Sequence, residues 1–189
     1  MKIAVTGLRP QKLPREYGYD YKNAAWTSLK NKFKSILLQN HCTDAYTGMA
    51  LGVDSCFAIA VMELKEAGCD IKLHAVLPCA NQEKTWPKES QIIYKTILSK
   101  ADEIIGITEK GYAELKLSDD LGLEKKDNTT DKRFKYIQEY KPYLMQKRNE
   151  YMVDQAHLVI AVWNGSTGGT KNCIEYAEKQ KKQIYKITP

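Results

Sequence analysis

The chain has 189 residues, 43% of them hydrophobic, and a formal net charge of +6 at pH 7. This content is enough for one well-buried domain, so we predict a single domain over residues 1–189. No apolar run approaches the length that spans a membrane, and the first residues, MKIAVTG, are typical of a strand and not of an export signal. We therefore expect a cytoplasmic protein without a membrane partner.

The charges and cysteines exclude some classes of site. The lysines are scattered and many alternate with acids, which is typical of a solvated surface, so a nucleic-acid partner is possible but not favoured. No metal site is predicted, because the cysteines form no CxxC or Cys/His pattern. No cofactor is predicted either. We expect most of them to be buried free thiols of a reducing cytoplasm: Cys42, Cys56, Cys69, Cys79 and Cys173.

Strand and helix patterns alternate along the chain. Apolar residues recur at helical spacing from Trp26 to Leu37 and again after Asp54, and further helices are expected at 89–101 and on both sides of the strand at 158–163. The expected strands lie at 3–5, at a short stretch that ends at Thr47-Gly48, and at 71–77, 103–107, 158–163 and 183–187. This alternation predicts an α/β fold, a Rossmann-like open and mainly parallel sheet with helices on both faces.

The alternation lapses at about residues 111–142. This stretch is highly charged and contains only scattered apolar residues. We interpret it as an insertion, part loop and part helix, that either caps a site or contacts a partner.

The most informative stretch is the strand at 158–163 with the loop that follows it. The uninterrupted apolar run of this strand is typical of a central parallel strand. The loop places several backbone N–H groups at the start of a helix, where the helix dipole is positive. This pattern favours an anionic, phosphate-bearing ligand, although the alternative is that the glycines only make the turn. The loop residues concerned are Asn164, Ser166, Gly168, Gly169 and Thr170.

Two earlier strand–loop junctions also combine Thr with Gly. The first strand runs into a Thr-Gly pair and then Arg9, which is either a ligand residue or an ordinary surface arginine. The loop after the second strand carries Gly48 and Gly52 and leads to Asp54, which can cap the helix or take a ribose hydroxyl. Recurrence of the pairing at three junctions is more than turns alone require, and it favours a ligand.

The loop after the strand at 71–77 carries Gln82 and Trp86. Both lie just past the carboxyl end of that strand, where ligands of open α/β sheets bind. Trp86 either stacks on a base or covers the edge of the core.

Several of these motifs resemble known families. The stretch TGMALGVD, from Thr47 to Asp54 and including Leu51, resembles the SGxARGID-type loop in the Rossmann domain of the DNA-processing protein A (DprA). Arg148-Asn149, with the loop at 166–170, resembles the RNR helix and SGS-type loop of the same family. This region is also similar to the Lonely Guy phosphoribohydrolases, in which an ERK helix precedes a strand and a PGGxGTxxE loop.

Over nearly the full chain, the sequence looks most like the YpsA-like branch of the SLOG superfamily, which is common in Firmicutes and their phages. The motifs that carry this resemblance are TGLRP, the Gln82/Trp86 loop and RNEYMVD. The resemblance implies a homo-oligomer, with the helix that carries residues 148–154 at or near a subunit contact; the alternative is that its apolar residues Met145 and Met152 serve the core. It also implies a pocket for a nucleotide or a nucleotide derivative such as ADP-ribose, NAD or a nucleoside monophosphate.

Three functions are consistent with that pocket. We favour a nucleotide sensor or sequestering module, and the alternatives are a phosphoribohydrolase that cleaves an N-glycosidic bond and a DprA-like binder of single-stranded DNA. The expected ligand-binding residues are Thr6, Gly7, Arg9, Gly48, Leu51, Gly52, Asp54, Gln82, Trp86, Arg148, Asn149, Asn164, Ser166, Gly168, Gly169 and Thr170.

One position departs from the hydrolase pattern. When the Gly-Thr pair at 169–170 is aligned with the GT of PGGxGTxxE, Cys173 stands where the hydrolases have their catalytic glutamate, while Arg148 still falls on the arginine of the ERK helix. A glycosidic bond to ribose breaks through an oxocarbenium-like state, which a carboxylate stabilises and a neutral thiol does not. The sequence therefore predicts a protein that binds nucleotides without cleaving them.

Other acids leave the enzyme question open. Glu175 is the nearest, but two further residues along a helix turn it by roughly 200° from Cys173. Asp54 or Asp154, from a neighbouring junction, is the alternative source of a carboxylate.

Overall fold

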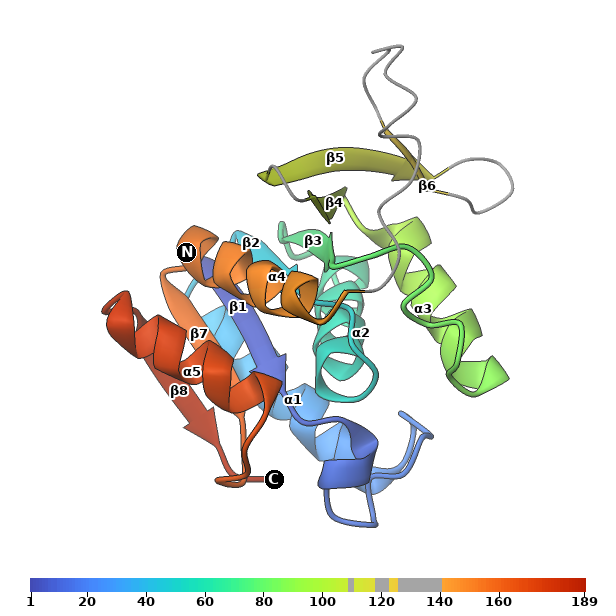
Figure 1. Ribbon diagram of the computed structural model, residues 1–189. Coiled ribbons are helices and arrows are strands. Elements are labelled where there is room, and N and C mark those ends of the chain that lie inside the picture. Colours follow the sequence, from blue (N-terminus) through green and yellow to red (C-terminus); the bar gives the residue numbers. More distant parts are fainter. Residues whose placement is uncertain (109–110, 118–122, 126–140) are drawn as a thin grey trace.

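The computed structural model describes residues 1–108, 111–117, 123–125 and 141–189. Its strands form one sheet in the order β6-β5-β4-β3-β2-β1-β7-β8 (Figure 1). The strands β1 to β4, β7 and β8 pair in parallel, whereas β5 and β6 extend the β4 edge in antiparallel orientation. The bounds are β1 (Lys2–Gly7), β2 (Asp44–Thr47), β3 (Lys72–Leu77), β4 (Glu103–Thr108), β5 (Gly111–Leu117), β6 (Leu123–Lys125), β7 (Leu158–Val162) and β8 (Gln183–Ile187).

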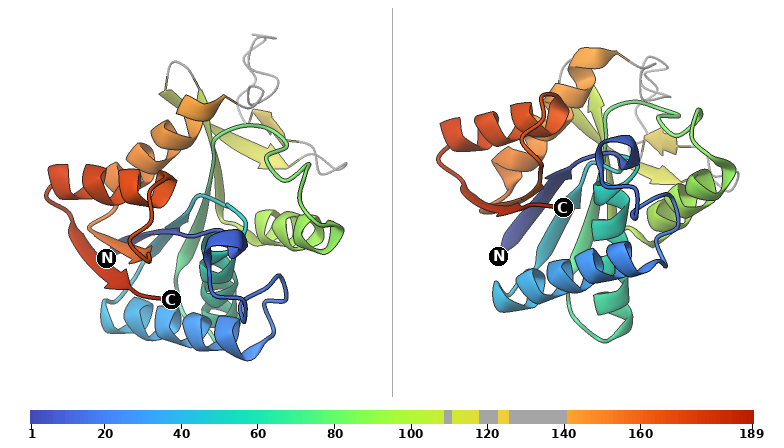
Figure 2. Two further views of the ribbon diagram at one scale, coloured as in Figure 1. Left: turned by 60° about the horizontal axis from the view of Figure 1, so that its bottom comes forward. Right: turned by 90° about the horizontal axis from the view of Figure 1, so that it is seen from below.

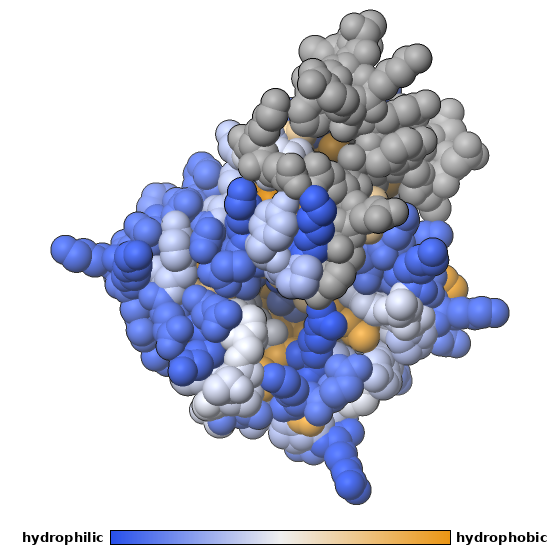
Figure 3. Space-filling model, viewed as in Figure 1, coloured by the Kyte–Doolittle hydropathy of each residue, from blue (hydrophilic) through white to orange (hydrophobic). Residues whose placement is uncertain are grey.

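Helices cover both faces of the sheet (Figures 1 and 2). The helices α1, α2 and α3 pack side by side on one face, and α4 and α5 pack together on the other. Each face has its own cluster of buried apolar residues. The outer surface on the side of α4 and α5 is mostly hydrophilic (Figure 3). The bounds are α1 (Ala24–Gln39), α2 (Val53–Glu66), α3 (Lys88–Lys100), α4 (Pro142–Gln155) and α5 (Gly169–Lys179).

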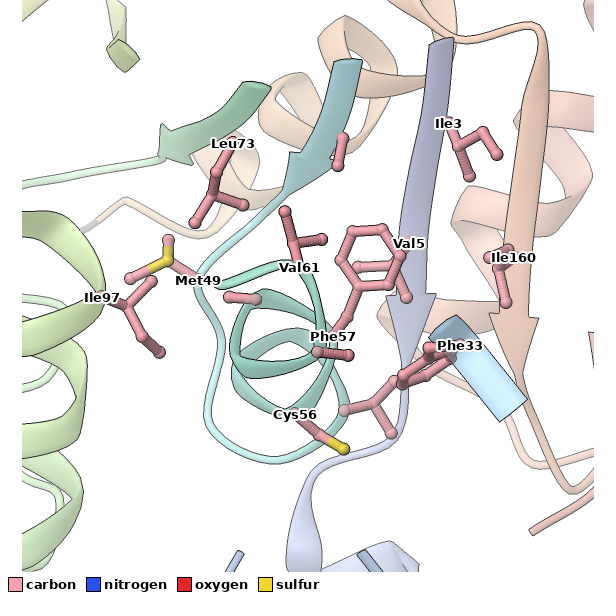
Figure 4. Packing of buried hydrophobic residues seen from close by; sticks show 14 of the residues in the cluster. Ile3, Val5, Phe33, Met49, Cys56, Phe57, Val61, Leu73, Ile97 and Ile160 are labelled. Atoms are coloured by element: carbon pink, nitrogen blue, oxygen red, sulfur yellow. The ribbon is translucent and has the colours of Figure 1, made fainter. Parts of the chain in front are cut away.

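Capping and apolar packing explain why these segments take their places. The helix α1 begins after Asn23, whose side chain accepts a hydrogen bond from the Trp26 N–H at 3.0 Å. On the buried face, Phe33 of α1 meets Phe57 of α2 edge to face, with ring centroids 5.4 Å apart (Figure 4). Every residue of β7 is buried, as its apolar run predicted. The sheet is therefore held between two apolar layers.

The order of the strands reverses at β1. From β1 the chain adds β2, β3 and β4 on one side, and it later returns to place β7 and β8 on the other side. Such a reversal in an open parallel sheet leaves a crevice at the carboxyl ends of the two strands that flank it. The predicted Rossmann-like fold is confirmed, and the crevice lies between β1 and β7.

The prediction for residues 111–142 was wrong in one respect. Part loop and part helix was expected, but residues 111–117 and 123–125 form strands. The signal is a period of two in β5: Leu115 is buried, Ala113 and Leu117 are half-buried, and the residues between them are exposed. Charges on the exposed side hid this alternation. Pro142 opens α4, and residues 118–122 and 126–140 lie outside the described part of the chain.

Two further features bear on the class of protein. All five cysteines are free, and four of them are buried. Within the described ranges, no helix is long and apolar enough to cross a membrane.

Candidate functional site

A cavity of about 470 Å³ lies at the carboxyl ends of β1 and β7, at the reversal of strand order. We call it the switch-point cavity. Four parts of the chain line it: the end of β1 with the segment that follows, the loop and first turn of α2, the first two turns of α4, and the start of α5. Segments that are far apart in the sequence therefore meet at one site.

Nine of the sixteen residues expected to bind a ligand line this cavity. They are Thr6, Gly7, Arg9, Asp54, Arg148, Asn149, Gly168, Gly169 and Thr170. The three Thr-Gly junctions of the sequence thus contribute unequally: of the nine residues, three come from the end of β1, three from the start of α5 and only Asp54 from the junction before α2.

The other seven expected residues lie outside the lining. Gly48, Leu51 and Gly52 belong to the buried loop before α2, behind the cavity wall. In the β7–α5 loop, the Asn164 side chain donates to the carbonyl oxygen of Lys12 at 3.1 Å, and its Oδ1 accepts from the Ser166 N–H at 3.1 Å. These residues shape the loops that flank the cavity.

The loop after β3 makes contacts within the protein. The Gln82 side chain donates to the Met49 carbonyl oxygen at 3.2 Å and to the Tyr94 hydroxyl at 3.3 Å. The Trp86 ring packs edge to face on Tyr94, with centroids 5.5 Å apart. Of the two interpretations of Trp86, the structure therefore favours cover for the core edge.

The glycines around the cavity differ in what they make room for. A Cβ on Gly7 would lie 2.3 Å from Cγ1 of Val53, and one on Gly48 would lie 2.6 Å from Cζ of Arg148. Packing inside the protein thus explains both of these glycines. A Cβ on Gly169 would meet nothing within 4 Å, so this position opens toward the cavity.

The start of α5 carries the features of an anion site. Gly168 has φ of +130° at the N-cap and provides no side-chain cap, and no side chain in the described part of the chain accepts from the first backbone N–H groups of the helix. The first turn of α5 contains no acid. Because unpaired N–H groups and the helix dipole both attract negative charge, this end of α5 favours an anion.

Arg148 is a buried cation in the wall of the cavity. The residue is 7% exposed. Its Nη1 donates to the Gly48 carbonyl oxygen at 2.6 Å, and its Nη2 donates to Oδ1 of Asn149 at 2.9 Å. None of the ion pairs between described residues involves Arg148. Nε also donates to Oδ1 of Asn149, at 3.2 Å, so the described residues take three of the five N–H groups of the guanidinium and leave two for a ligand.

Burial raises the pKa of two acidic groups near Arg148. Burial raises the pKa of Asp54, which is 3% exposed, although the Arg148 charge opposes the effect. Burial also raises the pKa of Cys173 to about 11, so its thiol is neutral at physiological pH. At the position of the hydrolase glutamate, this chain offers no negative charge.

Lys12 bridges the two loops at the edge of the cavity. Its Nζ donates to the Thr167 carbonyl oxygen at 2.8 Å and lies 3.2 Å from the position of a Cβ on Gly168. Sequence reasoning missed Lys12, although it follows Arg9 by three residues in the same loop. It also missed Met145, one helical turn before Arg148. The remaining unpredicted lining residues are Leu8, Gln11, Ala50, Pro142, Gln146, Thr167 and Asn172.

Comparison with known families and sequences gives matches over most of the chain. The YpsA family model, described as the YspA SLOG family, matches residues 3–130. The chain is 32% identical over 174 residues to the SPbeta prophage-derived protein YoqJ of Bacillus subtilis (strain 168), covering 89% of this chain and 92% of YoqJ. It is 34% identical over 134 residues to a UPF0398 protein of Bacillus thuringiensis (strain Al Hakam), covering 71% of this chain but only 58% of that protein.

Two solved structures share the fold. DprA of Streptococcus pneumoniae superposes with a TM-score of 0.59 at 15% identity, and the match covers 100% of this chain and 50% of that one. DprA of Helicobacter pylori, whose structure describes a single-stranded DNA binding mode, superposes with a TM-score of 0.56 at 16% identity, over 66% of its length. This chain thus spans one half to two thirds of each of these proteins.

Proposed function

This chain belongs to the YpsA SLOG family, and from that premise we propose that it binds a nucleotide or a nucleotide derivative through phosphate in the switch-point cavity. Nucleoside monophosphates, ADP-ribose and NAD are the candidate ligands. The protein would act as a sensor or a sequestering module. The volume of the switch-point cavity, about 470 Å³, supports a ligand of this size, because ligand pockets of proteins commonly measure about 300–1,000 Å³.

The observation that carries the proposal is the convergence of positive charge on an open helix start. Arg9, Lys12 and Arg148 line the cavity, and Asp54 is the single carboxylate in the described lining. The uncapped start of α5 faces the same space. Arg148 is buried, whereas Arg9 and Lys12 are exposed. A phosphate in the cavity would meet all three cations, and hydrogen bonds between charged groups are stronger than those between neutral ones, so a phosphate group is the natural occupant.

The arrangement of acids supports a binder over a hydrolase. Glu175 is exposed and pairs with Lys171 at 3.4 Å, and Asp154 accepts from the Tyr176 hydroxyl at 3.0 Å. Neither acid belongs to the cavity lining. Of the three acids that might have replaced the hydrolase glutamate, only Asp54 lines the site.

Titration calorimetry tests the binding proposal. The wild-type protein is titrated with AMP, ADP-ribose and NAD, with adenosine as the control that lacks phosphate. We expect saturable binding of at least one phosphate-bearing ligand and at least about tenfold weaker binding of adenosine, which corresponds to about 1.4 kcal/mol. Equal affinity for AMP and adenosine, or no binding of any of the four, would refute the proposal.

A turnover assay separates binding from cleavage. The protein is incubated with AMP, NAD and ADP-ribose, and ribose 5-phosphate and free base are followed by chromatography. We expect no turnover. Robust turnover that disappears in Asp54→Asn would show that Asp54 supplies the missing carboxylate and that the protein is a hydrolase.

Two other interpretations have direct tests. A DprA-like DNA binder would hold oligodeoxythymidine with an affinity that falls steeply as salt increases. A homo-oligomer with α4 near the subunit contact stays a prediction: Met152 of α4 is buried in the core and Met145 lines the cavity, so neither marks an outer contact. Sedimentation over a wide concentration range measures the assembly state.

A further inference from the structure

A second cavity, of about 620 Å³, lies between α2, α3 and the segment at 19–22. We propose that this α2–α3 cavity binds an uncharged aromatic small molecule. The two helices lie next to each other on the face of the sheet opposite α4 and α5 (Figure 2). The proposal is independent of the nucleotide site, because the two linings share no residue.

The walls of the α2–α3 cavity are apolar. Helix α2 contributes Ile59 and Met62, and α3 contributes Ile93 one turn before Ile97. Three of these side chains, Ile59, Met62 and Ile93, are only half-buried although they pack against the core. A ligand between the helices would complete their burial, which is the main source of affinity for an apolar molecule.

Tyrosine rings make the third wall. Tyr21 is buried and its ring lies 4.9 Å from Trp26, whereas Tyr19 is 45% exposed at the rim. Tyrosine rings prefer offset or edge contacts with other rings, so a flat aromatic occupant suits this wall better than a branched aliphatic one.

The charges at the rim nearly cancel. The Glu63 carboxylate accepts from Lys30 at 2.7 Å and from Lys34 at 2.8 Å, so it is already neutralised. The lining holds three carboxylates and two lysines, and Lys34, which lies outside it and pairs with Glu63, offsets the remaining negative charge. The switch-point cavity has an excess of positive charge, whereas this one has no such excess to select an ion, so an uncharged ligand follows. The charged residues of the lining are Asp20, Lys22, Lys30, Glu63 and Glu89.

One polar group in the lining lacks a partner. Ser90 is 3% exposed, and its Oγ makes no hydrogen bond with any residue that the structure describes. Because Ser90 lines the cavity, this hydroxyl is the polar group of the wall that a ligand oxygen could pair with. Buried hydroxyls are normally paired, so the preferred occupant carries one oxygen as well as an aromatic ring.

An NMR titration with 2-naphthol tests the proposal on the wild-type protein. We expect saturable amide shifts confined to α2, α3 and residues 19–22. Absence of saturation, or shifts elsewhere, would overturn the proposal. Shifts of the same amides on raising the protein concentration without 2-naphthol would overturn it too, because they would assign the groove to a second copy of the chain.

A pair of neighbouring substitutions supplies the control. Ile93→Trp should fill the cavity and weaken 2-naphthol binding at least tenfold, whereas Ile92→Trp, at a position 65% exposed and outside the lining, should leave it unchanged. Equal affinities in the two folded variants would overturn the proposal. Ser90→Ala should remove the preference for 2-naphthol over naphthalene, and a retained preference would overturn the role of the hydroxyl.

Discussion

The loops before α2 and before α5 look alike in sequence but differ in what their glycines serve. Both helices begin after a glycine with positive φ, +102° at Gly52 and +130° at Gly168. At α2, the Gly52 N–H donates to the Tyr21 hydroxyl at 2.8 Å and the Val53 N–H to the Leu8 carbonyl oxygen at 3.4 Å. At α5, no side chain of residues 1–108, 111–117 or 141–189 caps the first N–H groups.

The difference shows which of two similar helix starts can hold a ligand. The start of α2 is already occupied by protein groups, so its glycine serves the packing of the fold. The start of α5 faces the switch-point cavity and leaves its amides to a ligand. Glycine at a helix start therefore indicates a binding loop only where the neighbouring chain does not use the space it leaves.

We call the loop before α2 the closed loop and the loop before α5 the open loop. The largest expected effect is on the stability of the closed loop. Gly52→Ala should lower the free energy of unfolding by about 3 kcal/mol, because it combines a strained φ with crowding. The new Cβ would lie 2.9 Å from the Leu8 carbonyl oxygen. Thermal unfolding should show Tm falling by about 6–12 °C for a chain of this size. Gly165→Ala is the control: φ is also positive, at +89°, but nothing lies within 4 Å, so a smaller loss is expected. Equal losses of unfolding free energy in the two variants would show that crowding does not contribute to the effect at Gly52.

A smaller loss is expected from the hydroxyl that closes the α2 loop. Tyr21→Phe leaves the buried Gly52 N–H without an acceptor. The free energy of unfolding, measured with urea, should therefore fall by about 1–3 kcal/mol. Tyr19→Phe is the matched control, since the Tyr19 hydroxyl accepts from Gln11 at 2.9 Å on the exposed surface. We expect almost no change in the control. Equal effects would mean that the α2 start is not held by Tyr21.

The closed loop should also carry a pH dependence that the open loop lacks. Burial raises the pKa of Asp54, so the folded protein keeps this proton to higher pH than the unfolded chain does. The contribution to stability is therefore greatest below about pH 4, near the unfolded pKa, and is lost as pH rises through the raised folded pKa. Urea unfolding of wild type and Asp54→Asn between pH 3.5 and pH 7 measures it. Wild type should lose stability relative to the variant as pH rises, and a difference that is constant or grows in favour of wild type would contradict the assignment.

The smallest effect is expected on the open loop and has the opposite sign. The φ of Gly169 is not positive, and the space at its Cβ position is open. Gly169→Ala should therefore raise the free energy of unfolding by about 0.5 kcal/mol, because it restricts the unfolded chain. A clear loss of stability would show that the start of α5 is also packed against protein groups.

Sequence patterns predicted the fold well and the site in part. The apolar period of each strand and helix is a local property, so the parallel sheet and the contribution of the β7–α5 loop followed from it. Whether Gly48 serves Arg148 or a ligand depends on a residue 100 positions away, which no local pattern contains. Lys12 was missed for the same reason, since its role comes from Thr167 across the cavity. In β5, charges on the exposed side masked the strand period.

The central claim is that the start of α5 holds the anionic part of a nucleotide. The direct measurement is calorimetric titration of Gly169→Asp and Gly169→Asn, which have nearly the same shape and differ in charge, with the phosphate-bearing ligand that binds wild type. The added carboxylate should stabilise the fold slightly at a helix N-terminus while it repels the ligand. We predict that Gly169→Asp loses binding at least about a hundredfold, which is about 2.7 kcal/mol, while Gly169→Asn keeps most of it. Equal affinities of the two folded variants would contradict the claim.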